Sequence, residues 1–324
     1  MRLLCILHKN WLHSEGGLAN IGALIQRNNL RQSYTIMKKL FYALGTGILC
    51  ASASVGTAQQ NFDNVEIKTT HVAGNIHMLE GAGGNIGVSV GGDGILIIDD
   101  QFAPLANKIE EALRKLSPGP IKYLVNTHWH GDHTGGNAHF GKQASIIAHR
   151  NVRTRLADKS DTPKEALPVI TYADAISVHF NGEEIKIYPL PPGHTDGDSV
   201  IHFTGSGVLH MGDQFFNGRF PFIDLGSGGD VAGYAGNVAM VLEHLPEGTK
   251  IIPGHGPLAG REELEAFEDM LTETVSMMKK AIGEGKSLDQ IKAAGMPEKY
   301  KDWGSGFINT SRWLEITYND LSAK

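Results

Sequence analysis

Residues 121–133 read IKYLVNTHWHGDH, and this stretch decides both the fold and the chemistry. The apolar run Ile121–Asn126 predicts a buried strand, and a polar motif follows it almost directly. Where a strand ends in a loop, alternate side chains point the same way, so His128 and His130 can face one metal ion together. The stretch therefore predicts a strand that delivers two histidines to a metal site.

The same motif carries a second pair of metal-capable side chains. Gly131 lets the backbone turn, so that Asp132 and His133 face a neighbouring point. One ion cannot take four ligands from so tight a loop. The spacing therefore predicts two ions side by side.

Three later glycine-flanked segments offer the remaining ligands. They contain His194 in PPGHTDGDS, Asp213 in HMGDQF and His255 in IIPGHGP. Each segment follows a strand-like run, and loops at strand ends are where a rigid sheet usually positions functional side chains. We therefore expect these three residues in loops beside the first motif.

Histidine nitrogen and carboxylate oxygen suit zinc, and three protein ligands plus water are typical of a catalytic ion. We assign His128, His130 and His194 to the first ion, and Asp132, His133 and His255 to the second, while Asp213 bridges the two ions or completes the second. A shared water fills the remaining position on each ion. Asp99, in ILIIDD, fits a partner of a ligand histidine and a plain turn residue equally well.

Short apolar runs broken by glycine fill the chain from about residue 65, and stretches with helical periodicity separate them. Two such halves predict an α/β fold with two sheets packed face to face and helices outside. The region 159–172 is interpreted as a surface excursion. Strands are expected near 65–72, 75–80, 85–90, 94–98, 121–126, 176–180, 184–190, 199–203, 207–211 and 250–252, and helices near 105–116, 149–158, 233–245, 264–278, 287–294 and 308–321.

The seven predicted ligands, in this order, resemble the metallo-β-lactamase superfamily over roughly residues 65–258. The HxHxDH signature of that family stands here as His128, His130, Asp132 and His133, and its later histidine, bridging aspartate and GHG histidine match His194, Asp213 and His255. The resemblance implies a four-layer αβ/βα sandwich with two Zn²⁺ ions at one sheet edge.

Two positions depart from the β-lactamases that use a cysteine ligand. Those enzymes carry cysteine where this chain has Asp213, and commonly lysine where it has Phe216. The aspartate looks more like the lactonase and thioester-hydrolase branches of the family. Predicted export, in contrast, favours the β-lactamase-like branch.

An export signal is predicted near the N-terminus. Residues 37–60 read MKKLFYALGTGILCASASVGTAQQ, which combines two lysines, a short apolar run and small residues before Gln59. The apolar run is too short for a permanent membrane anchor. We therefore expect a signal peptide over 37–58, an over-extended reading frame over 1–36 and a single mature domain over 59–324. The expected location is the bacterial periplasm.

Removal of residues 1–58 changes the charge and the cysteine count. That stretch holds six of the 29 basic residues and one of the 35 acidic residues, which leaves 23 basic against 34 acidic residues and a net charge of −11. An acidic surface disfavours nucleic acid as a partner. Cys5 and Cys50 are also lost, so the mature chain is expected to have no disulfide and no thiolate ligand.

The resemblance and the ligand set together predict a zinc-dependent, β-lactamase-like hydrolase. A metal-bridging hydroxide would open an acyl bond in a small molecule, namely a β-lactam, lactone, thioester or ester, with Asp132 as the catalytic residue that orients the nucleophile. The main alternative is a mononuclear iron oxidoreductase of the same fold, similar to the persulfide dioxygenases. A nuclease and a non-catalytic metal-binding protein are further alternatives.

Overall fold

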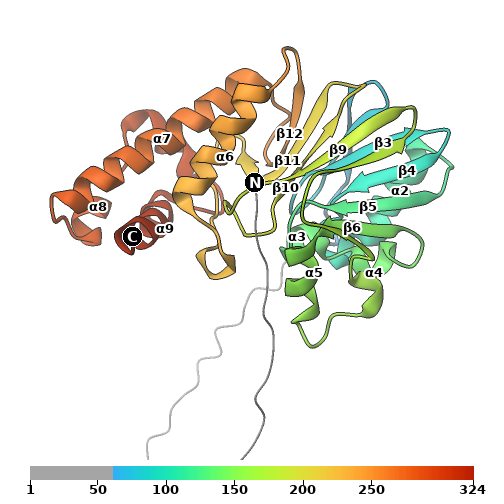
Figure 1. The fold of residues 1–324 in the computed structure, drawn as a ribbon, viewed down its shortest axis with the longest axis horizontal. Helices are drawn as coiled ribbons and strands as arrows, with labels where there is room; N and C mark the ends of the chain where they lie inside the picture. The colour runs from blue at the N-terminus through green and yellow to red at the C-terminus, as the bar shows by residue number, and fades with distance from the viewer. Residues whose placement is uncertain (1–60) are drawn as a thin grey trace, which may run out of the picture. The chain divides into compact units, whose positions relative to one another are not determined.

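The computed structural model describes residues 61–324 (Figure 1). The predicted signal peptide over 37–58 and the stretch 1–36 lie outside the described residues. Residues 61–324 pack as one compact unit. Within residues 61–324, no helix combines the length and the apolar character needed to cross a membrane.

Sheet A contains seven strands in chain order. Strands β1 to β4 are antiparallel neighbours, and β4 to β7 run parallel to one another. Parallel neighbours put their carboxyl ends at one edge, so the loop after β5 emerges at that edge. The strands are β1 (Lys68–Ala73), β2 (Ile76–Glu80), β3 (Ile86–Gly91), β4 (Gly94–Ile98), β5 (Ile121–Asn126), β6 (Ser145–His149) and β7 (Ile170–Tyr172).

Sheet B contains five strands in the order β12-β11-β10-β9-β8. Strands β11 and β12 are parallel, and the other neighbours are antiparallel. The strands are β8 (Ile176–Phe180), β9 (Glu183–Pro189), β10 (Ser199–Phe203), β11 (Val208–Phe216) and β12 (Lys250–His255).

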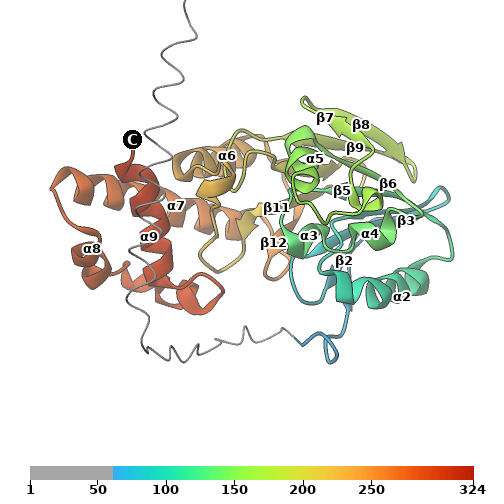
Figure 2. The ribbon, with the colours of Figure 1, turned by 90° about the horizontal axis from the view of Figure 1, so that it is seen from below.

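Helices cover the outer faces of both sheets (Figures 1 and 2). The α-helices are α2 (Ala106–Leu116), α3 (Gly131–Thr134), α4 (Asn137–Phe140), α5 (Arg150–Ala157), α6 (Val231–His244), α7 (Arg261–Gly283), α8 (Leu288–Ala294) and α9 (Thr310–Ser322). Four short 3-10 helices are η1 (Ala103–Leu105), η2 (Lys164–Ala166), η3 (Leu225–Ser227) and η4 (Glu298–Ser305).

Three apolar layers hold the sheets and helices together. Between the sheets, Leu96 of β4 belongs to the same buried cluster as Ile201 of β10. Ile109 of α2 packs in the cluster on the outer face of sheet A, and Tyr234 of α6 and Trp313 of α9 pack in the cluster outside sheet B. Because each sheet buries both faces, the helix–sheet–sheet–helix sandwich predicted from the sequence is confirmed.

The sequence analysis did not predict two strands of sheet A. Strand β6 was not predicted, and β7 lies at the end of the region 159–172, which was interpreted entirely as a surface excursion. That interpretation is wrong for Ile170–Tyr172, which pair with β6 at the edge of the sheet. A three-residue edge strand with Ile170 43% exposed carries almost no periodic signal, so only its pairing defines it.

The placement of two predicted ligands in loops is also wrong. Strand β11 extends to Phe216 and β12 to His255, so Asp213 and His255 lie in strands. The pairing of β11 with β12 shifts register on both sides of Gly212, whose φ of 50° is left-handed. In a sequence, glycine usually predicts the end of a strand. Here Gly212 forms a local irregularity, and the buried strand continues beyond it.

Candidate metal centre

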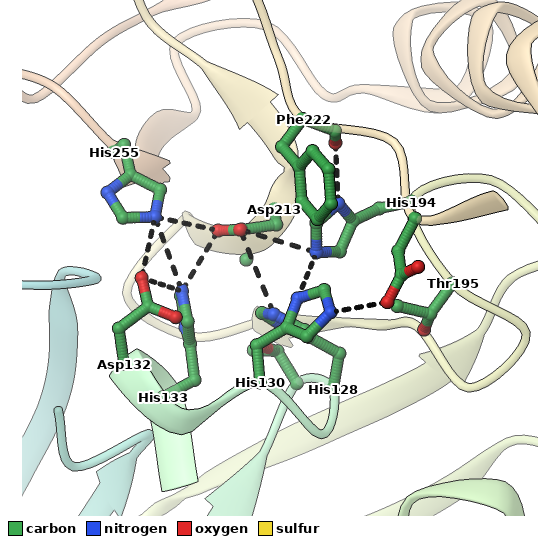
Figure 3. Close-up of polar contacts among 12 residues, drawn as sticks. His128, His130, Asp132, His133, His194, Thr195, Asp213, Phe222 and His255 are labelled. Atoms are coloured by element: carbon green, nitrogen blue, oxygen red, sulfur yellow. Dashed lines mark hydrogen bonds and ion pairs between the residues drawn. The ribbon is translucent and has the colours of Figure 1, made fainter. Parts of the chain in front are cut away.

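The seven predicted ligand side chains meet at one end of the two sheets, and Figure 3 shows them pointing toward one another. Sheet A supplies four of them from the end of β5 and the short helix α3, and sheet B supplies three. His128 and His130 follow β5, Asp132 and His133 lie in α3, His194 lies between β9 and β10, Asp213 lies in β11 and His255 ends β12.

The first cluster contains His128, His130, His194 and Asp213, each with a donor atom within 4.8 Å of the others. His130 Nδ1 lies 2.8 Å from His194 Nε2. Asp213 Oδ2 lies 3.4 Å from His194 Nε2 and 3.7 Å from His128 Nε2. These are the three histidines assigned to the first ion, together with Asp213, which was expected to bridge the two ions or to complete the second.

The second cluster contains Asp132, His133 and His255. His255 Nε2 lies 3.3 Å from Asp132 Oδ2 and 3.4 Å from His133 Nε2. Asp213 Oδ1 lies 3.0 Å from His133 Nε2 and 3.3 Å from His255 Nε2. One oxygen of Asp213 thus faces each cluster, which is the geometry that a bridging carboxylate requires.

Two buried atoms of the site test whether metal ions fit it. Among residues 61–324, His128 Nε2 is fully buried and has no hydrogen-bond partner, and buried Asp213 Oδ1 makes no hydrogen bond of good geometry, although His133 Nε2 lies 3.0 Å from it. Buried polar atoms are normally satisfied, and an orphaned nitrogen and oxygen that point into a set of histidines and carboxylates fit metal ligation. The donor set therefore fits two metal ions of the zinc type, and the role of each residue as a ligand stays a prediction.

Hydrogen bonds behind the first cluster fix its ring orientations. His130 Nε2 lies 2.9 Å from Asp224 Oδ2, and His194 Nδ1 donates to the carbonyl oxygen of Phe222 at 2.7 Å. These contacts leave His130 Nδ1 and His194 Nε2 free to face an ion. The sequence analysis missed Asp224, because it lies 94 residues from His130 and no motif marks it.

Asp99 has the equivalent position behind the second cluster. Its Oδ2 lies 2.8 Å from His133 Nδ1 and accepts a hydrogen bond from the Thr127 hydroxyl, while its Oδ1 accepts one from the backbone N of Thr127. Asp99 is fully buried and adopts a left-handed φ of 63°, which costs energy for a residue with a side chain. Of the two interpretations left open by the sequence, the structure supports the partner of a ligand histidine.

The protonation of the imidazoles differs between the clusters. Burial lowers the pKa of His194 to about 4 and holds the pKa of His128 well below its ordinary value. Burial acts the same way on His133 and His255, but there the facing carboxylates outweigh it. They raise the pKa of His133 well above its ordinary value and that of His255 to about 9. A metal ion in the second cluster would therefore have to displace protons.

Two glycines allow the backbone to approach the ligands closely. A Cβ atom at Gly84 would overlap the ring of His133, and one at Gly254 would overlap Asp213 Oδ1. Both positions therefore require glycine for steric reasons. Their place in the site is a feature that the sequence analysis did not identify.

Three side chains near Asp213 in sequence take different places. Tyr234 is fully buried, and its hydroxyl donates to the carbonyl oxygen of Asp213 at 2.8 Å, so it supports the strand. The ring of Phe216 stacks on that of His255, with ring centroids 4.9 Å apart. Arg219 packs against the C-terminal loop at Gly306.

Of the histidines not assigned to a metal, His210 is a core residue whose ring bonds to the carbonyl oxygen of Asn85.

Comparisons with known proteins agree with this geometry. Metallo-beta-lactamase type 2 of Bacteroides fragilis is 22% identical over 184 residues, which are 57% of this chain and 71% of that protein. A hydroxyacylglutathione hydrolase of Pelagibacter ubique is 31% identical over 140 residues, 42% of this chain and about half (52%) of that enzyme's length. The solved metallo-beta-lactamase from Pontibacter korlensis superposes with a TM-score of 0.55 at 17% identity and covers 64% of this chain and 99% of that one.

A match to a protein family extends over the whole metal centre. The profile of the metallo-beta-lactamase superfamily matches residues 79–255, which is more than half of the chain and includes all seven predicted ligands. The resemblance inferred from the HWHGDH motif is thereby confirmed. The chain belongs to the metallo-beta-lactamase superfamily.

Proposed function

We propose that this chain is a zinc-dependent hydrolase that holds two Zn²⁺ ions and opens an acyl bond in a small molecule. The observation that carries the proposal is the pair of adjacent donor clusters with Asp213 facing both. Hydrolase relatives such as the Bacteroides fragilis and Pelagibacter ubique proteins support the reaction type. The bond opened would belong to a β-lactam, lactone, thioester or ester.

Bound zinc ions would lower the pKa of a bound water to roughly 7 and stabilise negative charge on the carbonyl oxygen. His128, His130, His194 and Asp213 would hold one ion, and Asp132, His133 and His255, with Asp213, the other. In the reaction, water oxygen adds to the acyl carbon, the bond to nitrogen, oxygen or sulfur breaks, and the water proton passes to the leaving group.

We assign to Asp132 the transfer of the water proton to the leaving group. Its carboxylate is 26% exposed, whereas Asp213 is 5% exposed, so Asp132 can meet both the site and the solvent. Burial by itself would raise the pKa of Asp132, but His133 and His255 together outweigh it and keep that pKa below its ordinary value, so the carboxylate is ionised and can accept a proton. Asp132 would also orient the attacking water.

The test compares the zinc-loaded protein with its Asp132→Ala variant on a chromogenic cephalosporin, a lactone and a thioester. Turnover of at least one substrate, lowered by about a thousandfold in the variant, is expected from the loss of a base and ligand. Asp174→Ala removes an exposed aspartate from the β7–β8 connection and is the matched control. Full activity in a variant that still contains two zinc ions would refute the role of Asp132.

Metal analysis separates this proposal from the iron oxidoreductase alternative. Two zinc ions per chain and no oxygen consumption are expected. One iron per chain, with oxygen uptake in the presence of a persulfide, would favour the alternative. Seven donors divided between two clusters support the two-ion arrangement.

The proposed cellular setting rests on sequence alone. The pattern of residues 37–58 and the acidic mature chain favour an exported enzyme of the bacterial periplasm that acts on small molecules and not on nucleic acid. N-terminal sequencing of the mature protein tests this: an N-terminus at Gln59 is expected, and one upstream of Met37 would contradict it.

A further inference from the structure

Phe307 has the most exposed large apolar side chain in residues 61–324, at 88% of its full accessible surface. Its neighbours hold the loop in place. Ile308 is buried, and Asn309 caps helix α9 by accepting a hydrogen bond from the backbone N of Arg312. The ring therefore projects from an anchored backbone into solvent.

The loop that carries Phe307 is docked on the segment that follows Asp213. Backbone N of Phe220 donates to the carbonyl oxygen of Trp303 at 3.1 Å, and the ring of Phe220 stacks on Trp313 with centroids 5.9 Å apart. This contact joins η4 and α9 to the chain just before Phe222. The C-terminal helices thus fix Phe307 relative to the metal centre.

Phe222 connects the exposed ring to the first cluster. The rings of Phe307 and Phe222 meet edge to face, with centroids 6.4 Å apart. Phe222 lies 5.8 Å from the ring of His130 and 6.0 Å from that of His194. Figure 3 shows the Phe222 ring beside His194, to which its own carbonyl is hydrogen-bonded.

Single exposed apolar side chains are common and need no explanation. Phe307 differs because its ring contacts the partly buried ring of Phe222, which in turn lies against two predicted metal ligands. An apolar surface that begins at a reaction centre and ends in solvent offers a place for the apolar part of a substrate, which gains free energy when water leaves both surfaces.

We infer that Phe307 and Phe222 form an apolar rim that selects acyl substrates with a large apolar group, an aromatic ring or an alkyl chain of about six carbons or more. The inference rests on the proposed hydrolase function and adds the substrate class to it. Phe307 is a specificity-determining residue in this scheme and has no part in the chemistry.

The kinetic test uses γ-lactones that share one scissile bond and carry alkyl side chains of one to eight carbons. We expect kcat/KM of the zinc-loaded protein to rise with chain length. Phe307→Ala should lower kcat/KM about tenfold for the longest chain and leave the shortest unchanged, because only the long chain reaches the rim. Met240→Ala, which removes another exposed apolar side chain, in a cavity between α6 and sheet B that contains none of the predicted ligands, should change neither.

A binding test separates failure of the rim from failure of the proposed reaction. By calorimetry, the zinc-loaded protein should bind decanoate more tightly than acetate, and Phe307→Ala should lose about tenfold of that preference with its zinc content unchanged. If no lactone is hydrolysed but this preference is present and depends on Phe307, the inference about the rim is supported and the proposed acyl hydrolysis is contradicted. If Phe307→Ala leaves the preference intact, or affects short and long chains equally, the rim is overturned.

Discussion

The two donor clusters lie side by side and share Asp213, yet their surroundings differ. In the first cluster, His128 and His194 are 1% and 0% exposed, and burial keeps both imidazoles neutral. In the second cluster, Asp132 and His255 are 26% and 19% exposed, and carboxylates hold protons on His133 and His255. The first ion therefore meets two histidines that are already neutral, whereas the second competes with protons on His133 and His255.

The largest effect is expected where the clusters meet. Asp213→Ala removes a carboxylate that lies within 3.7 Å of a histidine nitrogen in each cluster. Affinity for both ions should fall, and hydrolysis should drop about a thousandfold or more, because charge stabilisation by the ions is lost. Zinc content by mass spectrometry and turnover measure this.

The control for Asp213→Ala is His255→Ala, which removes a ligand from the second cluster alone. This variant should lose the second ion and keep the first. If Asp213→Ala kept one ion at wild-type affinity, Asp213 would not be shared, and the two clusters would have to be treated as independent sites.

A matched pair of substitutions sharpens the difference between the clusters. Asp224→Asn should weaken binding of the first ion, because Asp224 orients His130, and Asp99→Asn should weaken the second, because Asp99 orients His133. Each effect is expected to be about 10- to 100-fold in affinity. Chelator competition against each variant measures the two affinities, and loss of the same ion in both variants would contradict the assignment.

The smallest effect expected is a difference in pH dependence. A pKa of about 9 for His255 means that its imidazole is charged below that pH, so a metal ion must displace a proton. Affinity for the second ion should therefore fall about tenfold per displaced proton as the pH drops from 8 to 7. His194, with a pKa of about 4, is already neutral in this range and contributes no such dependence to the first ion.

Calorimetry in buffers of different ionisation enthalpy counts the protons released with each ion. More protons should accompany the second ion than the first at pH 7. Equal proton release for both ions would show that the electrostatic difference between the clusters has no effect on metal binding.

Local sequence was sufficient for the parts of the site that lie close together in the chain. The strand Ile121–Asn126 and the motif after it were predicted with their bounds, because an apolar run and a run of ligands are both short-range patterns. The helical periodicity of α2 and α7 was equally readable, since one buried face repeats along a single helix.

Contacts across large sequence separations were not readable. Asp224 lies beside His130 because the chain after β11 folds back onto His194, and Phe307 meets Phe222 only because the C-terminal helices pack there. Asp99 was resolved only by its contact with His133. Glycines at 84 and 254 matter because the loop before β3 and strand β12 bring their backbones against ligands from elsewhere in the chain. No local pattern encodes such neighbours.

The sequence by itself determined the ligand types, their order and the α/β alternation, because these depend on side-chain chemistry and on periodicity within single elements. The tertiary structure alone decided that seven donors form two clusters, that Asp213 faces both, and that burial keeps His128 and His194 neutral while carboxylates hold protons on His133 and His255. The physical reason is that burial and charge at a site depend on what surrounds each group in space, and only the packing of the two sheets supplies those surroundings.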